Sequence, residues 1–363
     1  MRTLEKDELI ACIRNSVNVS EDEEGFLSFM RFTDKQLAVY EPNPLYRLMS
    51  NCSSGICLSL ETNADELTFE CRTAELNPKV LVEIKGEMTF GQILQLLGFT
   101  MKKVNQAGSK LDIIQYFDLY IDHAYQGAVR LGSGNLTFNI PNPEHKWVHV
   151  KIFLPPYKPL CIRNVSVNGE WRPIREKRPV LYAFGDSITQ GFISGRPSFC
   201  YVAQLAELLG ADALNQGIGG AMYDPHILDD FENLAAPDLI TVAYGTNDWR
   251  NNPDFDDITE RVTGFYERLN QLYPSIPTYV VTPIWRDDML EEQPSGTFDE
   301  VTQLIRKIAG AYPQIRLIDG LAISPHNPTC FADGFLHPNI MGFSYMVSRL
   351  YKAMKGWDRS QVN

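Results

Sequence analysis

Long hydrophobic runs are missing from this 363-residue sequence. No window approaches the roughly eighteen consecutive apolar residues at which a membrane-spanning helix becomes credible, so we expect no membrane partner. The chain also begins without the apolar core of a secretory signal, because Glu5, Asp7 and Glu8 interrupt the segment MRTLEKDELIACIRNSV. We therefore expect a cytoplasmic protein, unless a leader has been removed.

Basic residues are in deficit as well, with 33 Lys and Arg against 45 Asp and Glu and a net charge of -12. Nucleic-acid binding needs a clustered basic surface, so we expect no nucleic-acid partner. The seven cysteines are odd in number and scattered, without a C-x-x-C pair, which argues against a disulfide framework and a zinc cage. We expect neither a metal nor an organic cofactor.

The length favours two domains, and the first half of the chain is rich in strand patterns. Alternating runs such as Ile56–Leu60, Leu67–Cys71 and Trp147–Leu154 predict half-buried strands. With turn residues between them, these runs favour an antiparallel β-sandwich of jelly-roll type over residues 1–175. The polar stretch Arg172–Pro179 is the predicted linker.

Residues 176–363 change to apolar strands that alternate with amphipathic helices. Continuous apolar runs are typical of a parallel sheet that is buried on both faces. Helical spacing of apolar residues precedes Gly210 and Gly310, as expected where helices end. The pattern predicts a doubly wound α/β domain whose strands lie at Val180–Phe184, Asp212–Asn215, Leu239–Tyr244, Thr278–Thr282 and Ile315–Ile318.

The first predicted strand of this half runs into the turn G-D-S-I-T-Q-G, which contains Ser187. A serine hydroxyl is a weak nucleophile unless a base takes its proton. An isolated G-D-S is more often a helix cap made by Asp186 or Ser187. No G-x-S-x-G elbow is present, so the usual signature of the α/β-hydrolases is missing.

The next two predicted strands end in N-Q-G-I-G-G and G-T-N-D-W. Glycines let backbone N–H groups approach a ligand closely, which makes the Gly220 N–H a candidate oxyanion donor. The side-chain amide of Asn247 is a second candidate. Taken singly, a glycine cluster is usually a tight turn and an Asn a turn former.

Near the C-terminus, D-G-F-L-H-P-N places Asp333 and His337 in one loop before a predicted helix. A lone histidine is more often a packing or solvated residue. The position of His337 distinguishes it from the other five histidines of the sequence, because loops at the carboxyl ends of parallel strands converge in space. We expect the serine, glycine, asparagine and histidine of these turns to face one cleft.

These four blocks occur in the order of the sequence blocks of the SGNH (GDSL-like) hydrolases, and residues 179–356 resemble the catalytic domain of that family. The fold implied by the resemblance is a five-stranded, flavodoxin-like parallel sheet. The β-rich first half adds a likeness in architecture to two-domain carbohydrate acetyl esterases, which does not determine the substrate.

The resemblance also implies roles for individual residues. Ser187 is the implied nucleophile, His337 its general base and Asp333 the acid that orients the histidine. The implied oxyanion hole consists of the Ser187 N–H, the Gly220 N–H and the Asn247 amide.

Asp333 departs from the family spacing, because it precedes His337 by four residues where the family usually has three. One additional residue can span up to ~3.3–3.6 Å, enough to carry the carboxylate out of reach. Gly334 offers a remedy, since a glycine can adopt a positive φ and return the carboxylate to the histidine. In the alternative interpretation, Asp319 or a backbone carbonyl orients the imidazole.

The predicted function is that of a serine carboxylic-ester hydrolase that removes short acyl groups, with acetyl on a carbohydrate or small molecule as the favoured substrate. A lipase, thioesterase or acyltransferase using the same residues stays open, as does a carbohydrate-binding protein with an inactive second domain. The aromatic residues near the blocks could either line a substrate pocket or pack in the core, and the sequence leaves both roles open: Tyr223, Trp249, Trp285 and Phe335.

Overall fold

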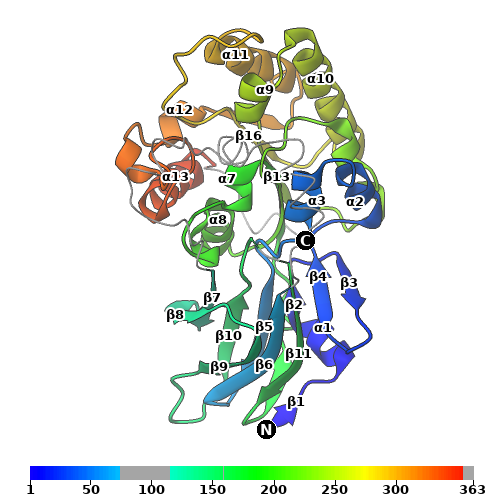
Figure 1. Ribbon diagram of the computed structural model, residues 1–363, viewed down its shortest axis with the longest axis vertical. Helices are drawn as coiled ribbons and strands as arrows, with labels where there is room; N and C mark the ends of the chain where they lie inside the picture. Colours follow the sequence, from blue (N-terminus) through cyan, green and yellow to red (C-terminus); the bar gives the residue numbers. More distant parts are fainter. Residues whose placement is uncertain (74–114, 158, 355–363) are drawn as a thin grey trace.

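The computed structural model describes residues 1–73, 115–157 and 159–354. The described strands form three sheets, of which two are antiparallel and one is parallel. Figure 1 shows the antiparallel sheets in the lower half of the molecule and the parallel sheet with its helices in the upper half.

The antiparallel sheets each contain six strands. The first has the strands β1 (Arg2–Thr3), β3 (Asn18–Glu21), β4 (Leu27–Met30), β6 (Glu66–Thr73), β9 (Gly134–Asn139) and β11 (Leu160–Val167), in the order β3-β4-β11-β6-β9 with β1 on β11. The second has β2 (Ile13–Arg14), β5 (Cys57–Thr62), β7 (Tyr116–Ile121), β8 (Ala124–Arg130), β10 (Val148–Phe153) and β12 (Trp171–Pro173), in the order β12-β5-β10-β7-β8 with β2 on β5.

Alternating burial explains why these strands pack as a sandwich. Along β6, Leu67, Phe69 and Cys71 are buried while their sequence neighbours are only half-buried. They share one apolar core with residues of the other sheet, among them Leu58 and Ile152. The predicted antiparallel β-sandwich is therefore confirmed, and its jelly-roll type stays a prediction.

The parallel sheet consists of β13 (Val180–Gly185), β14 (Asp212–Gly217), β15 (Leu239–Ala243), β16 (Thr278–Val281) and β17 (Ile315–Ile318), in the order β14-β13-β15-β16-β17. Helices lie between these strands and after the last one: α7 (Ser187–Gln190), α8 (Tyr201–Leu209), α9 (Thr246–Asn251), α10 (Phe255–Leu272), α11 (Phe298–Ala309), α12 (Gly320–Ile323) and α13 (Ile340–Ala353). Short 3-10 helices lie at Pro197–Phe199, Pro225–Leu228, Phe231–Asn233 and Pro328–Cys330.

Both faces of the parallel sheet are covered. Along β13, Tyr182 and Phe184 belong to the core that includes residues of α10 and α11. Leu181 and Ala183 belong instead to the core that includes residues of α8 and α13. This burial on two faces confirms the predicted doubly wound α/β architecture.

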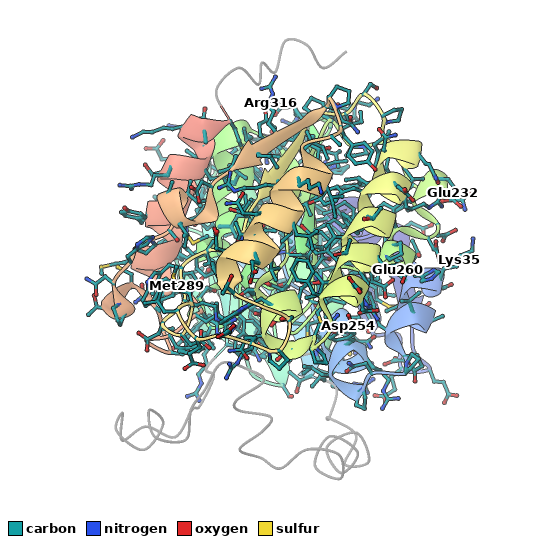
Figure 2. The ribbon with its side chains drawn as sticks, turned by 90° about the horizontal axis from the view of Figure 1, so that it is seen from above. Lys35, Glu232, Asp254, Glu260, Met289 and Arg316 are labelled. Atoms are coloured by element: carbon teal, nitrogen blue, oxygen red, sulfur yellow. The ribbon has the colours of Figure 1, made fainter. Side chains whose placement is uncertain are left out.

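The N-terminal half also contributes helices to the α/β part. Besides α1 (Lys6–Cys12), it contains α2 (Asp34–Tyr40) and α3 (Pro44–Ser50). Apolar side chains of this region, including Tyr40 and Met49, lie in the same core as Phe184. In Figure 1 the two helices lie beside the parallel sheet. Figure 2 shows Lys35 on the same side of the molecule as Glu232 and Glu260, and Lys35 pairs with Asp230 at 3.0 Å.

Within the described ranges, none of the helices combines the length and the apolar character that crossing a membrane requires.

Candidate active site

Ser187 lies where β13 ends and α7 begins. The carboxylate of Asp186 caps this helix by accepting a hydrogen bond from the Ile188 N–H at 2.9 Å. The side chain of Ser187 is only 6% exposed. The strand-to-helix turn thus presents the hydroxyl at the carboxyl edge of the parallel sheet, where ligands of such sheets bind.

A chain of hydrogen bonds joins the serine, the histidine and the acid. His337 Nε2 lies 2.9 Å from Ser187 Oγ, and His337 Nδ1 lies 2.7 Å from Asp333 Oδ2. A carboxylate accepts only, so Nδ1 carries the proton and Nε2 is free to accept the serine proton. The three predicted residues are therefore brought together in the geometry of a nucleophile, a base and an orienting acid.

Both oxygens of the Asp333 carboxylate accept hydrogen bonds. While Oδ2 faces His337, Oδ1 accepts backbone hydrogen bonds from Phe335, Leu336 and His337 at 2.9–3.1 Å. Burial alone would raise the pKa of Asp333, but the charge and hydrogen bond of His337, together with the backbone N–H groups, lower it below its ordinary value. Asp333 thus faces the histidine as a carboxylate.

Gly334 absorbs the additional residue in this loop. Its φ of +65° is in the left-handed region, which glycine adopts without strain. A Cβ at this position would have no neighbour within 4 Å, so the requirement concerns the backbone alone. Asp319, the alternative acid, caps α12 and pairs with Arg306 at 3.3 Å instead.

Two backbone groups beside the serine point to an oxyanion site. The described residues offer no hydrogen-bond acceptor to the N–H of Ser187 or to that of Gly220. Gly220 has a φ of +82° and follows β14, which neighbours β13, the strand that leads to Ser187. Two N–H donors are thus available at the edge of the sheet where the serine lies.

Asn247 adds a third donor. Its Nδ2 donates one hydrogen bond, to the carbonyl of Ala221 at 3.1 Å, while an amide nitrogen carries two hydrogens. Asn247 is 6% exposed and is the second residue of α9, which follows β15. The predicted oxyanion residues therefore lie at the ends of three neighbouring strands.

The carboxyl groups of Asp186 and Asp248 are also buried near this edge of the sheet, and their pKa values shift in the direction opposite to that of Asp333. Burial raises the pKa of Asp186 to about 7 and that of Asp248 to about 6. Asp248 Oδ1 accepts from the Tyr223 N–H at 2.9 Å, and its Oδ2 has no partner among the described residues. Asp333 is the acid that contacts the histidine and has a lowered pKa.

The aromatic residues divide into two groups. The pocket-wall prediction is wrong for Tyr223 and Trp249, which are fully buried in the core. The hydroxyl of Tyr223 is 2.9 Å from that of Tyr266, and Trp249 Nε1 donates to the Gly296 carbonyl at 3.1 Å. Buried indole and phenol groups satisfied in this way serve packing.

Trp285 and Phe335 are only partly buried, so a pocket-wall role stays a prediction for both. Phe335 lies two residues before His337, and the Trp285 ring packs against that of Phe331 at 4.8 Å. Both residues belong to the loops around the histidine.

Sequence reasoning missed several neighbours of the catalytic residues. The Phe192 ring packs edge-on against the His337 ring at 5.0 Å. Tyr157 donates a hydrogen bond to the carbonyl of Gly191, and Tyr46 donates one to the carbonyl of Gly220 at 2.9 Å. Tyr46 and Tyr157 come from the N-terminal half, where no motif marks them.

In the parts of the chain that the structure describes, no group of three or more His, Cys, Asp or Glu side chains is arranged to hold a metal ion. The expectation of a cofactor-free reaction stays a prediction.

Comparison with protein families identifies the C-terminal part. Residues 183–343 match the GDSL-like Lipase/Acylhydrolase family, so this part of the chain is a GDSL-like (SGNH) domain. The match contains all five residues of the predicted catalytic and oxyanion set. A search of curated protein sequences finds no match.

Solved structures show the same two-part fold. A salicylyl-acyltransferase from a tetracycline biosynthetic pathway is similar with a TM-score of 0.74 and 18% identity, over 94% of this chain and 93% of that chain. A family two carbohydrate esterase from Clostridium thermocellum, solved with cellohexaose, has a TM-score of 0.61 and 12% identity, over 84% and 93%. An acetyl xylan esterase from the rumen bacterium Butyrivibrio proteoclasticus has a TM-score of 0.57 and 15% identity, over 98% and 97%. At these identities the likeness shows the fold alone.

Proposed function

We propose that this protein, whose C-terminal part is a GDSL-like lipase/acylhydrolase domain, is a serine carboxylic-ester hydrolase that releases short acyl groups, acetyl above all, from a carbohydrate or small molecule. The observation that carries the proposal is the hydrogen-bonded chain from Ser187 through His337 to Asp333. At the same edge of the sheet, the N–H groups of Ser187 and Gly220 have no acceptor among the described residues.

The proposed reaction begins with proton transfer from Ser187 Oγ to His337 Nε2, across the 2.9 Å that separates them. The oxygen attacks the ester carbonyl, and the negative charge on the carbonyl oxygen is stabilised by the N–H groups of Ser187 and Gly220 and by the Asn247 amide. The imidazolium then protonates the leaving alcohol as the acyl-enzyme forms. Asp333 holds the tautomer and stabilises the imidazolium.

Water completes the proposed cycle. His337 removes a proton from the water as its oxygen attacks the acyl carbon, and the resulting tetrahedral intermediate occupies the same donors. Collapse returns the proton to Ser187 Oγ and releases the carboxylic acid. Each step is a proton or acyl transfer, and apart from water the proposed reaction uses only side chains and backbone N–H groups of the described residues.

Support for acetyl on carbohydrate comes from the fold shared with an acetyl xylan esterase and with a carbohydrate esterase solved with cellohexaose. A second candidate is an acyltransferase, favoured by the higher TM-score of the salicylyl-acyltransferase. The two differ in what resolves the acyl-enzyme, since water is the acceptor in one and a hydroxyl or amine of a second substrate in the other. The cytoplasmic compartment stays a prediction.

Acetate release from a panel of acetylated sugars, together with p-nitrophenyl esters of rising chain length, tests the proposal. We expect Ser187→Ala to remain folded and to lose about 10⁶ in kcat, as other serine triads do. Ser344→Ala is the matched control, because this exposed serine on α13 contacts Gln204 at 3.2 Å and not the site. Turnover of any of these esters by Ser187→Ala at near the normal rate would exclude the mechanism.

Added alcohols distinguish the second candidate. A hydrolase gives acid from every ester, whereas an acyltransferase gives a new ester or amide at the expense of acid. A fluorophosphonate probe that leaves Ser187 unlabelled in the folded protein would favour the inactive, carbohydrate-binding alternative.

A further inference from the structure

The turn that presents the Gly220 N–H is short and rich in glycine. It spans residues 218–221, immediately after β14, and Gly219 and Gly220 both lack a Cβ. A peptide unit between two glycines has little steric resistance to rotation. Other contacts must therefore hold the Gly220 N–H toward the serine.

One flank of this peptide is held by the α7 side of the site. The Gly219 N–H donates a hydrogen bond to Gln190 Oε1 at 2.8 Å, and the Gln190 side chain is fully buried. Gln190 belongs to the helix that begins with Ser187. This contact fixes the peptide on the N-terminal side of the donor.

The other flank is held from the N-terminal half of the chain. The Tyr46 hydroxyl donates to the Gly220 carbonyl at 2.9 Å. The next N–H in the turn, that of Ala221, donates to the Ile218 carbonyl at 3.0 Å. These two bonds fix the peptide on the C-terminal side of Gly220, so the donor peptide is clamped between two held neighbours.

Tyr46 is itself rigidly placed. It lies in the first turn of α3, where Asn43 Oδ1 accepts from the Leu45 and Tyr46 N–H groups and Pro44 begins the helix. Its ring packs edge-on against that of Tyr40 at 6.2 Å. Burial raises the pKa of Tyr46, so its hydroxyl stays a donor throughout the pH range in which an esterase works.

Buried polar contacts fasten this region to the end of β14. Arg31 is 0% exposed and donates to the carbonyls of Asn215 and Gly217 at 2.7 and 2.8 Å. Gln36 on α2 donates to Gln216 Oε1 at 2.8 Å. The strand that leads into the oxyanion turn is therefore tied to the segment that carries Tyr46.

From this geometry we propose that Tyr46 is a positioning residue for the oxyanion hole. By holding the Gly220 carbonyl, its hydroxyl keeps the Gly220 N–H aimed at the oxygen that becomes negative in the transition state. The inference rests on the proposed esterase function and adds to it a contribution from the N-terminal half. Tyr46 does not contact the reacting atoms in this role, and its effect passes through the backbone of the turn.

Tyr46→Phe tests the inference, because it removes the hydroxyl and keeps the ring. Losing an oxyanion donor outright costs about 10²–10³ in kcat, so loosening one should cost about tenfold. With p-nitrophenyl acetate we expect kcat to fall by about that factor and KM to stay within about twofold, since the donor acts in the transition state. The inhibition constant of a short-chain trifluoromethyl ketone, whose serine adduct is tetrahedral, should rise by about the same factor as kcat falls.

Tyr40→Phe is the matched control, since this neighbouring buried tyrosine has its ring against Tyr46 and no hydrogen bond to the turn. We expect wild-type kcat from it. Wild-type kcat in Tyr46→Phe, an equal loss in Tyr40→Phe, or a change confined to KM would each overturn the positioning role. Absence of esterase activity in the wild type, with Ser187 unlabelled by a fluorophosphonate, would instead overturn the proposed function, and the Tyr46 inference with it.

Discussion

The reactive groups and the groups that brace them come from different parts of the molecule. Ser187, Gly220 and Asn247 follow three neighbouring strands of the parallel sheet, and His337 immediately precedes α13. Gln190 braces the oxyanion turn from within the C-terminal half, whereas Tyr46 and Tyr157 come from the N-terminal half, most of which forms the β-sandwich. In the proposed mechanism the reacting groups all come from the C-terminal half, while contacts from both halves hold them in place.

A second contact supports this comparison on the other side of the serine. Asp118 on β7 is 0% exposed and accepts from Arg196 Nε and Ser198 Oγ, each at 2.7 Å. Arg196 and Ser198 lie in the segment that follows α7. The N-terminal half therefore contacts the segment after α7 through β7 of the sandwich, and the oxyanion turn through Tyr46 on α3.

The largest effect of a change on the reactive side, after loss of the nucleophile, is expected for Asp333→Asn. The amide keeps an oxygen for the three backbone N–H groups, so the loop should fold. Its nitrogen would face His337 Nδ1 and favour the tautomer that has no lone pair on Nε2. We expect kcat to fall by about 10⁴, measured with a fully folded variant.

Asp319→Asn is the control for that prediction, because Asp319 caps α12 away from the imidazole. It should retain kcat within about twofold. A loss below tenfold in folded Asp333→Asn would leave a Ser187–His337 dyad in place of the triad.

A smaller effect on the same side is expected for Asn247→Ala, which removes a donor and also the bond to the Ala221 carbonyl. We expect kcat to fall by about 10²–10³ with little change in KM. Steady-state kinetics on p-nitrophenyl acetate measure both values. Gln303→Ala serves as the control, because this exposed amide on α11 contacts Asp299 at 3.2 Å and not Asn247. A pure KM effect in Asn247→Ala would contradict the oxyanion role.

On the bracing side, Arg31→Met should act on stability. Arg31 is fully buried and has no carboxylate partner among the described residues, and burial lowers its pKa to about 10. It donates to the carbonyls of Cys52, Asn215, Gly217 and Met49, which the substitution would leave without this donor. An unsatisfied buried acceptor costs about 1–3 kcal/mol, so we expect a loss of about 3 kcal/mol or more in the free energy of unfolding, measured by urea denaturation.

Arg172→Met gives the contrast. Arg172 is exposed and pairs with Glu61 at 2.5 Å on the sandwich surface, and such pairs contribute roughly 0–1 kcal/mol. If Arg31→Met unfolds at the same urea concentration as Arg172→Met, the tie between the N-terminal segment and β14 is not a stabilising contact.

Much of the fold could be predicted from local patterns. The five predicted parallel strands are present within two residues at each end, as Asp212–Asn215 and the observed Asp212–Gly217 illustrate. Continuous apolar runs indicate strands of a sheet that is buried on both faces. Gly210 ends α8 in the left-handed conformation, as expected for a helix C-cap. Such signals depend on neighbouring residues only.

The role of α2 and α3 could not be predicted in this way. Each helix has seven residues, and the pattern of its apolar side chains does not indicate which sheet the helix will pack against. They pack on the α/β core although the chain around them builds the sandwich. Tyr223 and Trp249 illustrate the same limit, since an aromatic residue near a motif has the same sequence signature in a pocket wall and in a core.

The sequence by itself determined the two architectures and was enough to predict the catalytic and oxyanion side chains, because strand periodicity and short motifs are local properties. The sequence also indicated how Asp333 can reach His337 across a spacing of four residues, because Gly334 can adopt a positive φ. Only the tertiary structure decided that Asp333, and not Asp319, meets His337, and that Tyr46 meets Gly220. The first pairing depends on how the loop around Gly334 folds, and the second on where two segments far apart in the sequence lie. Each hydrogen bond, of 2.7 and 2.9 Å, forms only after folding has placed both partners.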